Sequence, residues 1–422
     1  MHLHRARLAL VLLALLPGAA AGELRAGAAA VEIRAPAGVP LAGYGARGPG
    51  NHAAGSLAPV EARALVVEGA GGAPRVAIAV LDALIVVPDL REAVRAAVDD
   101  LALDALVLAA THTHSGPGGY LDDRVAGAMI LGWYQPPART ALVEAAVQAL
   151  RRAAASLRPA RLATASARGE DLARNRRREG GPQDPAIPIL AVDGDGGAVA
   201  TLFALAAHPT VLSPANLRLS PDYPGAARRR VEAARGGVAL FLAGPLGDQE
   251  PHLDGEPEWP EDVERQVQTA QRLGEALGER VLRALAGARP APPRVGAARR
   301  DWRLPPVDVR ASCAWYAFAP VLHLVARRFL PSQTPLVALR LGDLRLLASP
   351  LELGVEVAAA IRARAGDEGP LLLAAHANDW LGYLLTPEDW DRGGYEPCLS
   401  YHGRDLAPRF VEEAAGVLGA LP

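Results

Sequence analysis

Short, mainly apolar runs alternate along the chain with longer amphipathic segments. Six of these runs are five to seven residues long, and each ends at a polar cluster. Continuous apolar runs of this length are typical of strands buried on both faces of a sheet. We therefore predict strands over Val76–Leu81, Ala105–Ala110, Thr201–Ala207, Val238–Ala243, Leu344–Ala348 and Leu371–Ala375.

The segments between the runs carry arginine and glutamate at positions that form one solvated face of a helix. The predicted helices cover Arg139–Ala155, Pro224–Arg235, Asp262–Ala286, Leu351–Arg364 and Pro408–Leu418. This alternation predicts an α/β fold, in which ligand sites lie beyond the carboxyl ends of the strands. A Pro-rich and Ala-rich stretch, Ala288–Arg294, has the composition of a linker. Polar-ended strands occur on both sides of it, so one shared site in one large domain is the simpler interpretation.

The first residues have the pattern of a signal peptide. Arg5 and Arg7 precede nine apolar residues, Leu8–Leu16, and a run of small residues, Ala19–Ala21, follows. Nine apolar residues are too few for a membrane-spanning helix, which needs about 20. We predict a signal peptide over residues 1–21, cleavage between Ala21 and Gly22, and a secreted or periplasmic protein.

Composition excludes several kinds of chemistry. The 422 residues include 44 that are Lys or Arg, and all of them are arginine. The absence of lysine excludes Schiff-base, Ser-Lys and Walker-type mechanisms. A formal net charge of −2 gives no general attraction to nucleic acid or to anionic membranes. The two cysteines, Cys313 and Cys398, are equally consistent with a disulfide and with two buried thiols.

Two motifs resemble known ligand-binding loops but lack their context. Gly43–Gly48 matches a dinucleotide-binding pattern, yet Pro49 follows it where a helix has to begin. Asp193–Gly197 starts like a calcium loop, but Ala204 stands where the bidentate glutamate is required. We interpret the second motif as a hairpin turn.

The most informative string is Thr111-His-Thr-His-Ser-Gly-Pro-Gly-Gly-Tyr120, directly after a predicted strand. In an extended chain residues i and i+2 point the same way, so His112 and His114 converge if strand geometry continues. Imidazole nitrogens suit zinc. His208, Glu352 and the segment His376–Tyr383 follow other predicted strands, which favours a catalytic metal site assembled from separate segments.

These residues resemble the neutral ceramidase family over nearly the whole chain after the signal peptide. The histidine string is the most specific part of the resemblance. The other matching segments follow in the family's order: Ala28–Ile33, Gly43-Tyr44, Asn175-Arg176, Asp184-Pro185, Ala207–Thr210, Gly247-Asp248, Pro350–Glu352 and Gly382–Glu388.

The resemblance implies a fold of central mixed β-sheets flanked by helices and one bound zinc ion. It implies that the zinc ligands are His112, His208, Glu352 and Tyr383. His114, Arg176 and Tyr395 match positions that polarise the substrate or transfer protons. The implied reaction is hydrolysis of an amide by zinc-activated water.

One departure from the family pattern concerns catalysis. The family motif Gly-Asp-x-Ser-Pro-Asn here reads Gly247-Asp-Gln-Glu-Pro-His252, so Glu250 replaces the serine. A serine nucleophile is therefore excluded at this position. Glu250 is a candidate general base or a contact for a different substrate, and a structural carboxylate at a turn is an equally good interpretation.

A second departure is that the family's C-terminal β-sandwich domain has no counterpart after the last predicted helix. We expect a secreted zinc amidohydrolase acting on ceramide or a related lipid amide, with peripheral membrane contact and no nucleic-acid partner. A zinc hydrolase for another amide or ester is the first alternative. A protein that binds metal or lipid without turnover is the second.

Overall fold

The computed structural model describes residues 23–48, 50–255, 262–310 and 319–422. The predicted signal peptide, residues 1–21, lies outside these ranges, as does Cys313. Cys398 is disulfide-bonded. Within the described residues no helix is both long and apolar enough to cross a membrane.

Two β-sheets form the centre of the molecule. The larger, nine-stranded sheet has the order β4-β3-β2-β1-β5-β7-β8-β9, with β11 paired to β5. Its strands are β1 (Arg25–Glu32), β2 (Glu61–Glu68), β3 (Arg75–Leu81), β4 (Ala105–Ala110), β5 (Arg158–Arg168), β7 (Ala186–Gly194), β8 (Gly197–Leu205), β9 (Val238–Ala243) and β11 (Arg289–Ala291).

The second sheet has the order β12-β13-β14-β16, and two short ribbons pair β6 with β10 and β15 with β17. These strands are β12 (Val295–Arg303), β13 (Gln333–Leu341), β14 (Leu344–Ala348), β16 (Leu371–Ala374), β6 (Ala173–Asn175), β10 (Gln249–Pro251), β15 (Glu352–Leu353) and β17 (Tyr383–Leu384).

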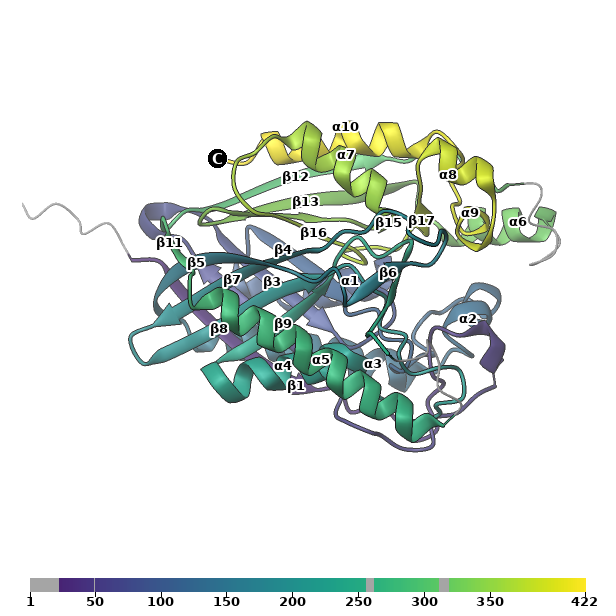
Figure 1. Cartoon of the computed structure of the whole chain (residues 1–422), viewed down its shortest axis with the longest axis horizontal. Helices are drawn as coiled ribbons and strands as arrows, with labels where there is room; N and C mark the ends of the chain where they lie inside the picture. The colour runs from purple at the N-terminus through teal and green to yellow at the C-terminus, as the bar shows by residue number, and fades with distance from the viewer. Residues whose placement is uncertain (1–22, 49, 256–261, 311–318) are drawn as a thin grey trace, which may run out of the picture.

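Helices cover the outer faces of both sheets (Figure 1). The helices of the described residues are α1 (Pro88–Ala97), α2 (Arg124–Ile130), α3 (Pro136–Ala155), α4 (Asp222–Arg235), α5 (Val263–Leu285), α6 (Ala319–Phe329), α7 (Val355–Ala365), α8 (Pro387–Arg392), α9 (Tyr395–Cys398) and α10 (Leu406–Gly419). Helices α3, α4 and α5 pack on the larger sheet, and α10, with α7 beside it, packs on the smaller one.

The inner faces of the two sheets share one apolar core, so the layers are stacked helix, sheet, sheet, helix (Figure 1). Val67, Ile78 and Leu242 of the larger sheet and Leu346 and Leu372 of the smaller sheet belong to this core. Apolar side chains on both faces of a strand are therefore buried, either under helices or between the sheets. This burial explains why the strands read as continuous apolar runs.

The fold confirms the predicted α/β class, with mixed sheets flanked by helices. All six predicted strands exist, to within a few residues at their ends. Most neighbouring strands are antiparallel, but four pairs are parallel: β3 with β4, β8 with β9, β14 with β16 and β15 with β17. The predicted turn at Asp193–Gly197 connects the antiparallel strands β7 and β8.

Two predictions of local structure are wrong. Helix α7 begins at Val355 rather than Leu351, because Glu352 and Leu353 pair with Tyr383 and Leu384 as strands β15 and β17. The Pro-rich stretch Ala288–Arg294 is no linker, because Arg289–Ala291 pairs with β5 as strand β11. In both cases a partner distant in the sequence decides the local structure.

Candidate metal centre

Five polar side chains meet where strands of both sheets end. His112 follows β4, His208 follows β8 and His376 follows β16, while Glu352 and Tyr383 belong to the paired short strands β15 and β17. All five side chains are buried. The residues that follow β4, β8 and β16 thus lie beyond strand ends, where α/β folds place their ligands.

His112 and His114 converge as expected, but not because strand geometry continues. Strand β4 ends at Ala110, and His112 has a φ of 65°, in the left-handed region. The two Nε2 atoms still approach to 3.4 Å. A left-handed residue that is not glycine costs free energy, so tertiary contacts have to hold His112 in this conformation.

The histidine rings of His112 and His208 are oriented by the backbone. The Nδ1 of His112 lies 2.8 Å from the carbonyl oxygen of Leu84, and the Nδ1 of His208 lies 2.8 Å from that of Gln249. A carbonyl oxygen only accepts, so each Nδ1 carries the proton and each Nε2 presents a lone pair. This arrangement is typical of histidines that bind a metal.

Both lone pairs face the same carboxylate oxygen. The Oε2 of Glu352 lies 3.3 Å from the Nε2 of His208 and 3.7 Å from the Nε2 of His112. The other oxygen, Oε1, accepts a 2.8 Å hydrogen bond from the indole of Trp380. Oε2 is buried without a hydrogen bond. A buried carboxylate oxygen without a donor is costly, and a cation among these three atoms would satisfy it.

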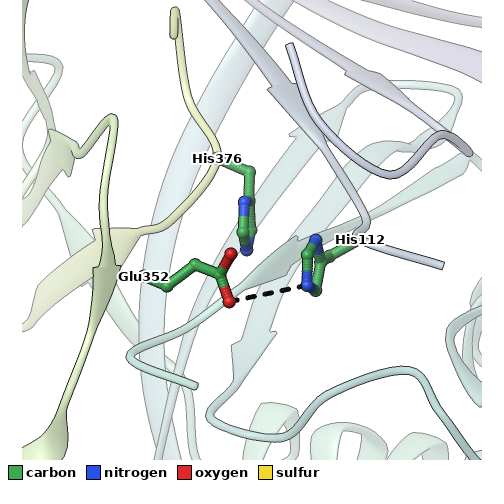
Figure 2. Close-up of side chains that lie close together, drawn as sticks. All are labelled: His112, Glu352 and His376. Atoms are coloured by element: carbon green, nitrogen blue, oxygen red, sulfur yellow. Dashed lines mark ion pairs between the residues drawn. The ribbon is translucent and has the colours of Figure 1, made fainter. Parts of the chain in front are cut away.

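His376 also lies close to this group, and Figure 2 shows it beside Glu352 and His112. Ligand atoms of His112, Glu352 and His376 lie within 4.8 Å of one another. The rings of His112 and His376, however, are stacked, with centroids 3.7 Å apart and planes 8° apart. Lone pairs in parallel rings do not converge, and a metal about 2.0 Å from both nitrogens would lie far outside both ring planes. The ring of His208, inclined 65° to that of His112, can share a metal with His112.

Tyr383 lies beside His208. Its hydroxyl is 3.5 Å from the Nε2 of His208 and accepts a 3.1 Å hydrogen bond from Arg176. Glu352 and Tyr383 are neighbours because they are paired residues of the parallel strands β15 and β17. The four residues implied by the resemblance as ligands, His112, His208, Glu352 and Tyr383, therefore lie together.

Arg176 is held in place by three further groups. It donates to Glu396 at 2.9 Å and to the carbonyl of Gly247 at 3.0 Å, and it lies 3.5 Å from the Nε2 of His208. Its guanidinium also lies near the rings of Tyr383 and Tyr395. A fixed cation beside a metal site is suited to stabilising a negatively charged oxygen.

His114 and Tyr395 lie at the edges of the group. The ring of His114 contacts Tyr44, with centroids 4.7 Å apart, and a Cβ at Gly43 would lie 2.6 Å from its Cγ. Gly43, with a φ of 101°, is therefore required for His114 to occupy this place. Tyr395 is 40% exposed, and its ring lies 5.9 Å from that of Tyr383.

Glu250 is held by a strand pair and by an ion pair. It is the residue opposite Arg174 in the antiparallel ribbon β6–β10, and the two side chains form an ion pair. Glu250 and Arg174 line the same large cavity. This pairing favours the structural interpretation, a carboxylate that holds Arg174, over the proposed general base.

Burial controls the charge of the site. Desolvation, reinforced by neighbouring cationic groups, lowers the pKa of His112, His114 and His208, so the imidazoles are neutral near pH 7. Burial would raise the pKa of Glu352, but the facing histidines outweigh it and lower the pKa. Burial and the Glu352 charge raise the pKa of Tyr383 well above 10, so its phenol keeps the proton. Neutral imidazoles with an ionised carboxylate are the form that binds a divalent metal.

Sequence reasoning gave no role to several residues that support the site. Trp380 fixes Glu352, Glu396 fixes Arg176, and Gly43 makes room for His114. Arg228 of α4 donates two hydrogen bonds to the fully buried Asp82, at the end of β3. Asp82 had a signal, since it ends a predicted strand, whereas Arg228 is one of three successive arginines in a helix and had none.

Comparison with known protein families identifies the family of this chain. The family described as neutral/alkaline non-lysosomal ceramidase, N-terminal, matches residues 25–257, more than half of the chain. The matched part contains His112, His114, Arg176, His208 and Glu250. The chain belongs to this family.

Two curated relatives are similar over part of their length. The neutral ceramidase of Pseudomonas aeruginosa is 32% identical over 169 residues, which are 36% of this chain and 25% of that protein. The neutral ceramidase of Mycobacterium tuberculosis is 26% identical over 209 residues, 44% of this chain and 32% of that protein. The aligned segments thus span about a quarter to a third of these relatives.

Two solved structures share the fold. The crystal structure of neutral ceramidase from Pseudomonas aeruginosa superposes with a TM-score of 0.81 at 21% identity, covering 94% of this chain and 74% of that one. A structure described as ceramidase complexed with C2 superposes with a TM-score of 0.80 at 20% identity, covering 94% of this chain and 75% of that one.

Proposed function

We propose that this protein is a zinc-dependent amidohydrolase that cleaves the N-acyl bond of ceramide or a related lipid amide. The observation that carries the proposal is the orphaned Oε2 of Glu352, which faces the Nε2 atoms of His112 and His208. Membership of this family, and the similarity to two neutral ceramidases, support the choice of reaction.

The residues that would hold zinc are His112, His208 and Glu352, with the phenol of Tyr383 as a fourth group beside them. Two neutral imidazoles and a carboxylate are a ligand set that zinc hydrolases use. Bound zinc supplies Lewis-acid polarisation of an amide carbonyl and makes hydroxide available near pH 7.

The remaining groups would act on the substrate itself. Arg176 is a permanent cation with a fixed guanidinium, so it would bind the carbonyl oxygen and stabilise the charge that develops there. Tyr395, which is part-exposed, and His114 would orient the amide and donate a proton to the leaving amine. Burial of the histidines and Glu352 excludes bulk water and strengthens these interactions.

We also propose that the protein is exported, on the basis of the charged start, the apolar run Leu8–Leu16 and the small residues before Gly22. Peripheral contact with membranes, the source of a lipid amide, belongs to the same proposal. Fractionation of cells that express the full chain, with N-terminal sequencing of the product, tests both export and the cleavage site.

Metal analysis and an amide hydrolysis assay on the purified protein test the main proposal. We expect about one zinc per chain, release of fatty acid from N-acylsphingosine, and loss of both in His112→Ala and Glu352→Ala. A folded wild-type protein that takes up no zinc would refute the metal site. Zinc binding without hydrolysis of any amide or ester would indicate the non-catalytic alternative, and hydrolysis of esters alone would indicate a different substrate.

A further inference from the structure

Two cavities of opposite character reach the metal centre. The larger has a volume of about 890 Å³ and is dominated by charged and polar groups. Its charged lining residues are Arg174, Arg176, Arg177, Arg178, Arg392, Glu179, Glu250 and Glu396. The smaller, of about 60 Å³, is an apolar cleft between α2 and α6 that includes Ile130, Phe329, Trp380 and Leu399.

Each cavity contacts the centre through one side chain. Arg176 lines the arginine-rich cavity and donates to the hydroxyl of Tyr383. Trp380 lines the apolar cleft and donates to the carboxylate of Glu352. Tyr395 lines both cavities. A bond cleaved beside Tyr395 would therefore lie between an apolar group on one side and a polar group on the other.

The arginine-rich cavity presents cations and hides most of its anions. The side chains of Arg174 and Arg392 are 41% and 51% exposed, whereas their partners Glu250 and Asp389 are 12% and 4% exposed. Glu396, buried at 6%, is paired with both Arg176 and Arg177. The lining holds five arginines against three glutamates, of which Glu179 is exposed. Guanidinium groups that face open space are suited to carboxylate and phosphate.

Large apolar side chains are exposed on the two helices that line the apolar cleft. Val125 of α2 and Leu324 of α6 are 53% and 70% exposed beside it. Large exposed apolar side chains next to a cleft mark a surface that binds apolar ligands. The cleft and its rim are thus suited to a single acyl chain.

We propose that the substrate is an amphiphilic amide whose acyl chain lies in the α2–α6 cleft and whose amine side carries a carboxylate or phosphate in the arginine-rich cavity. This inference rests on the proposed amidohydrolase function and narrows its substrate. Ceramide has two long apolar chains and only hydroxyl groups as its polar part, so it offers no anionic group to the part-exposed guanidiniums of Arg174 and Arg392. Glu250 then has a positioning role, because its ion pair with Arg174 holds that guanidinium at the cavity wall.

The reaction is an ordinary hydrolysis. Water adds across the amide C–N bond, so the acyl carbon gains oxygen and the nitrogen gains a proton. The products are a fatty acid, released from the apolar cleft, and an anionic amine, released from the arginine-rich cavity. No oxidant, reductant or further reactant is needed.

A series of amides with one acyl chain and different amine sides tests the inference. The compounds are dodecanoyl amides of glycine, of phosphoethanolamine, of ethanolamine, of ethylenediamine and of sphingosine. For the zinc-loaded wild type we expect kcat/KM for the better anionic amide to exceed that for the ethanolamide by about tenfold or more. The difference should shrink as salt rises from about 0.05 to about 0.5 M. Glycine against phosphoethanolamine shows whether carboxylate or phosphate is preferred.

Variants test whether the preference for anionic amides depends on the arginine-rich cavity. Arg392→Gln should lower kcat/KM for the anionic amide by about tenfold while changing the ethanolamide less than about twofold. Asp389 keeps Arg178 as a partner in this variant. The double variant Arg174→Gln/Glu250→Gln should behave likewise without leaving Glu250 unpaired. The control is Arg161→Gln on β5, whose side chain is 71% exposed and paired only at the surface with Asp195, and it should match the wild type.

The outcomes of these assays distinguish failure of the anionic-substrate inference from failure of the proposed amidohydrolase function. Faster cleavage of the sphingosine amide or the ethanolamide, with no effect of salt, would overturn the anionic substrate and leave the amidohydrolase intact. If no amide is cleaved, the proposed function fails. Calorimetric titration with dodecanoylglycine then tests separately whether the arginine-rich cavity binds an anionic amide. Binding that weakens about tenfold in Arg392→Gln supports the cavity's role, and equal affinity in both proteins overturns it.

Discussion

The imidazole rings of His112 and His376 lie face to face, with centroids 3.7 Å apart and an angle of 8° between their planes. This contact places His376 against one face of a candidate ligand rather than beside its lone pair. His208, on the other hand, presents its Nε2 to the same oxygen of Glu352 as His112 does. The structure therefore distinguishes a histidine that can share a metal with His112 from one that supports the ring.

We predict that His208 and His376 differ in their importance for zinc. His208→Ala should weaken zinc affinity by more than about 100-fold, because it removes a ligand, while His376→Ala should cost about tenfold or less. Competition with a chromophoric chelator measures both affinities, and circular dichroism checks the fold. Equal losses in the two variants would make His376 a ligand.

Trp380 should tune zinc affinity without binding the metal. Trp380→Phe keeps the aromatic volume but removes the donor to Glu352 Oε1, so zinc affinity should fall by about 10-fold to 100-fold. The matched control is Trp302→Phe, which alters a buried indole packed on Phe410. Unchanged affinity in Trp380→Phe would show that the indole hydrogen bond does not orient the carboxylate.

Arg176 should matter for turnover more than for metal content. Arg176→Gln removes the cation beside Tyr383 and His208, so we expect kcat to fall by about 10²-fold to 10³-fold. Zinc content should stay near that of the wild type, with Arg161→Gln as the control. A variant that loses zinc in proportion to activity would instead place Arg176 among the groups that organise the metal site.

The ion pair of Arg228 with Asp82 should stabilise the fold beneath the site. Arg228 donates at 2.8 and 2.7 Å to the two oxygens of Asp82, and both side chains are buried. Arg228→Met leaves a buried carboxylate without its cation, and we expect a loss of about 3–5 kcal/mol in the free energy of unfolding. The double variant Asp82→Asn/Arg228→Met should lose less than Arg228→Met alone, which urea unfolding measures.

Asp222 should make the folded protein less stable as pH rises, which is the opposite of the usual effect of an aspartate. Burial raises its pKa in the folded state to about 6, above the ordinary value of 3.8 for an aspartate. Between about pH 4 and 6 the folded protein therefore binds more protons than the unfolded chain, so this group's contribution to stability falls as pH rises. Over this pH range the contribution of Asp222 to the free energy of unfolding falls by about 3 kcal/mol in total.

Asp222→Asn should remove that part of the pH dependence. Asparagine tolerates the left-handed backbone of this position, where φ is 56°. Relative to the variant, the wild type should lose stability as pH rises from about 4 to about 6. Asp195→Asn, on a side chain that is 79% exposed, is the control. Parallel pH profiles for wild type and Asp222→Asn, from urea unfolding of metal-free protein, would contradict the prediction.

Local pattern along the chain is enough to predict six of the described strands and the approximate positions where they end. Strands such as Val238–Ala243 are buried on both faces, so their burial is visible as a continuous apolar run. The polar residues after these runs, among them His208, were found because ligand sites lie beyond the strand ends. The residue types at these positions indicate a metal site, and the family resemblance named the same positions.

Tertiary structure decided how those positions are used. Glu352 belongs to a strand rather than a helix because Tyr383, thirty-one positions later, pairs with it. His112 reaches His114 through a left-handed turn rather than an extended strand. Glu250 faces Arg174 because β10 pairs with β6. The Arg228–Asp82 pair likewise joins segments 146 positions apart. Residue spacing carries information about neighbours in the chain, whereas these contacts depend on pairing and packing between distant segments.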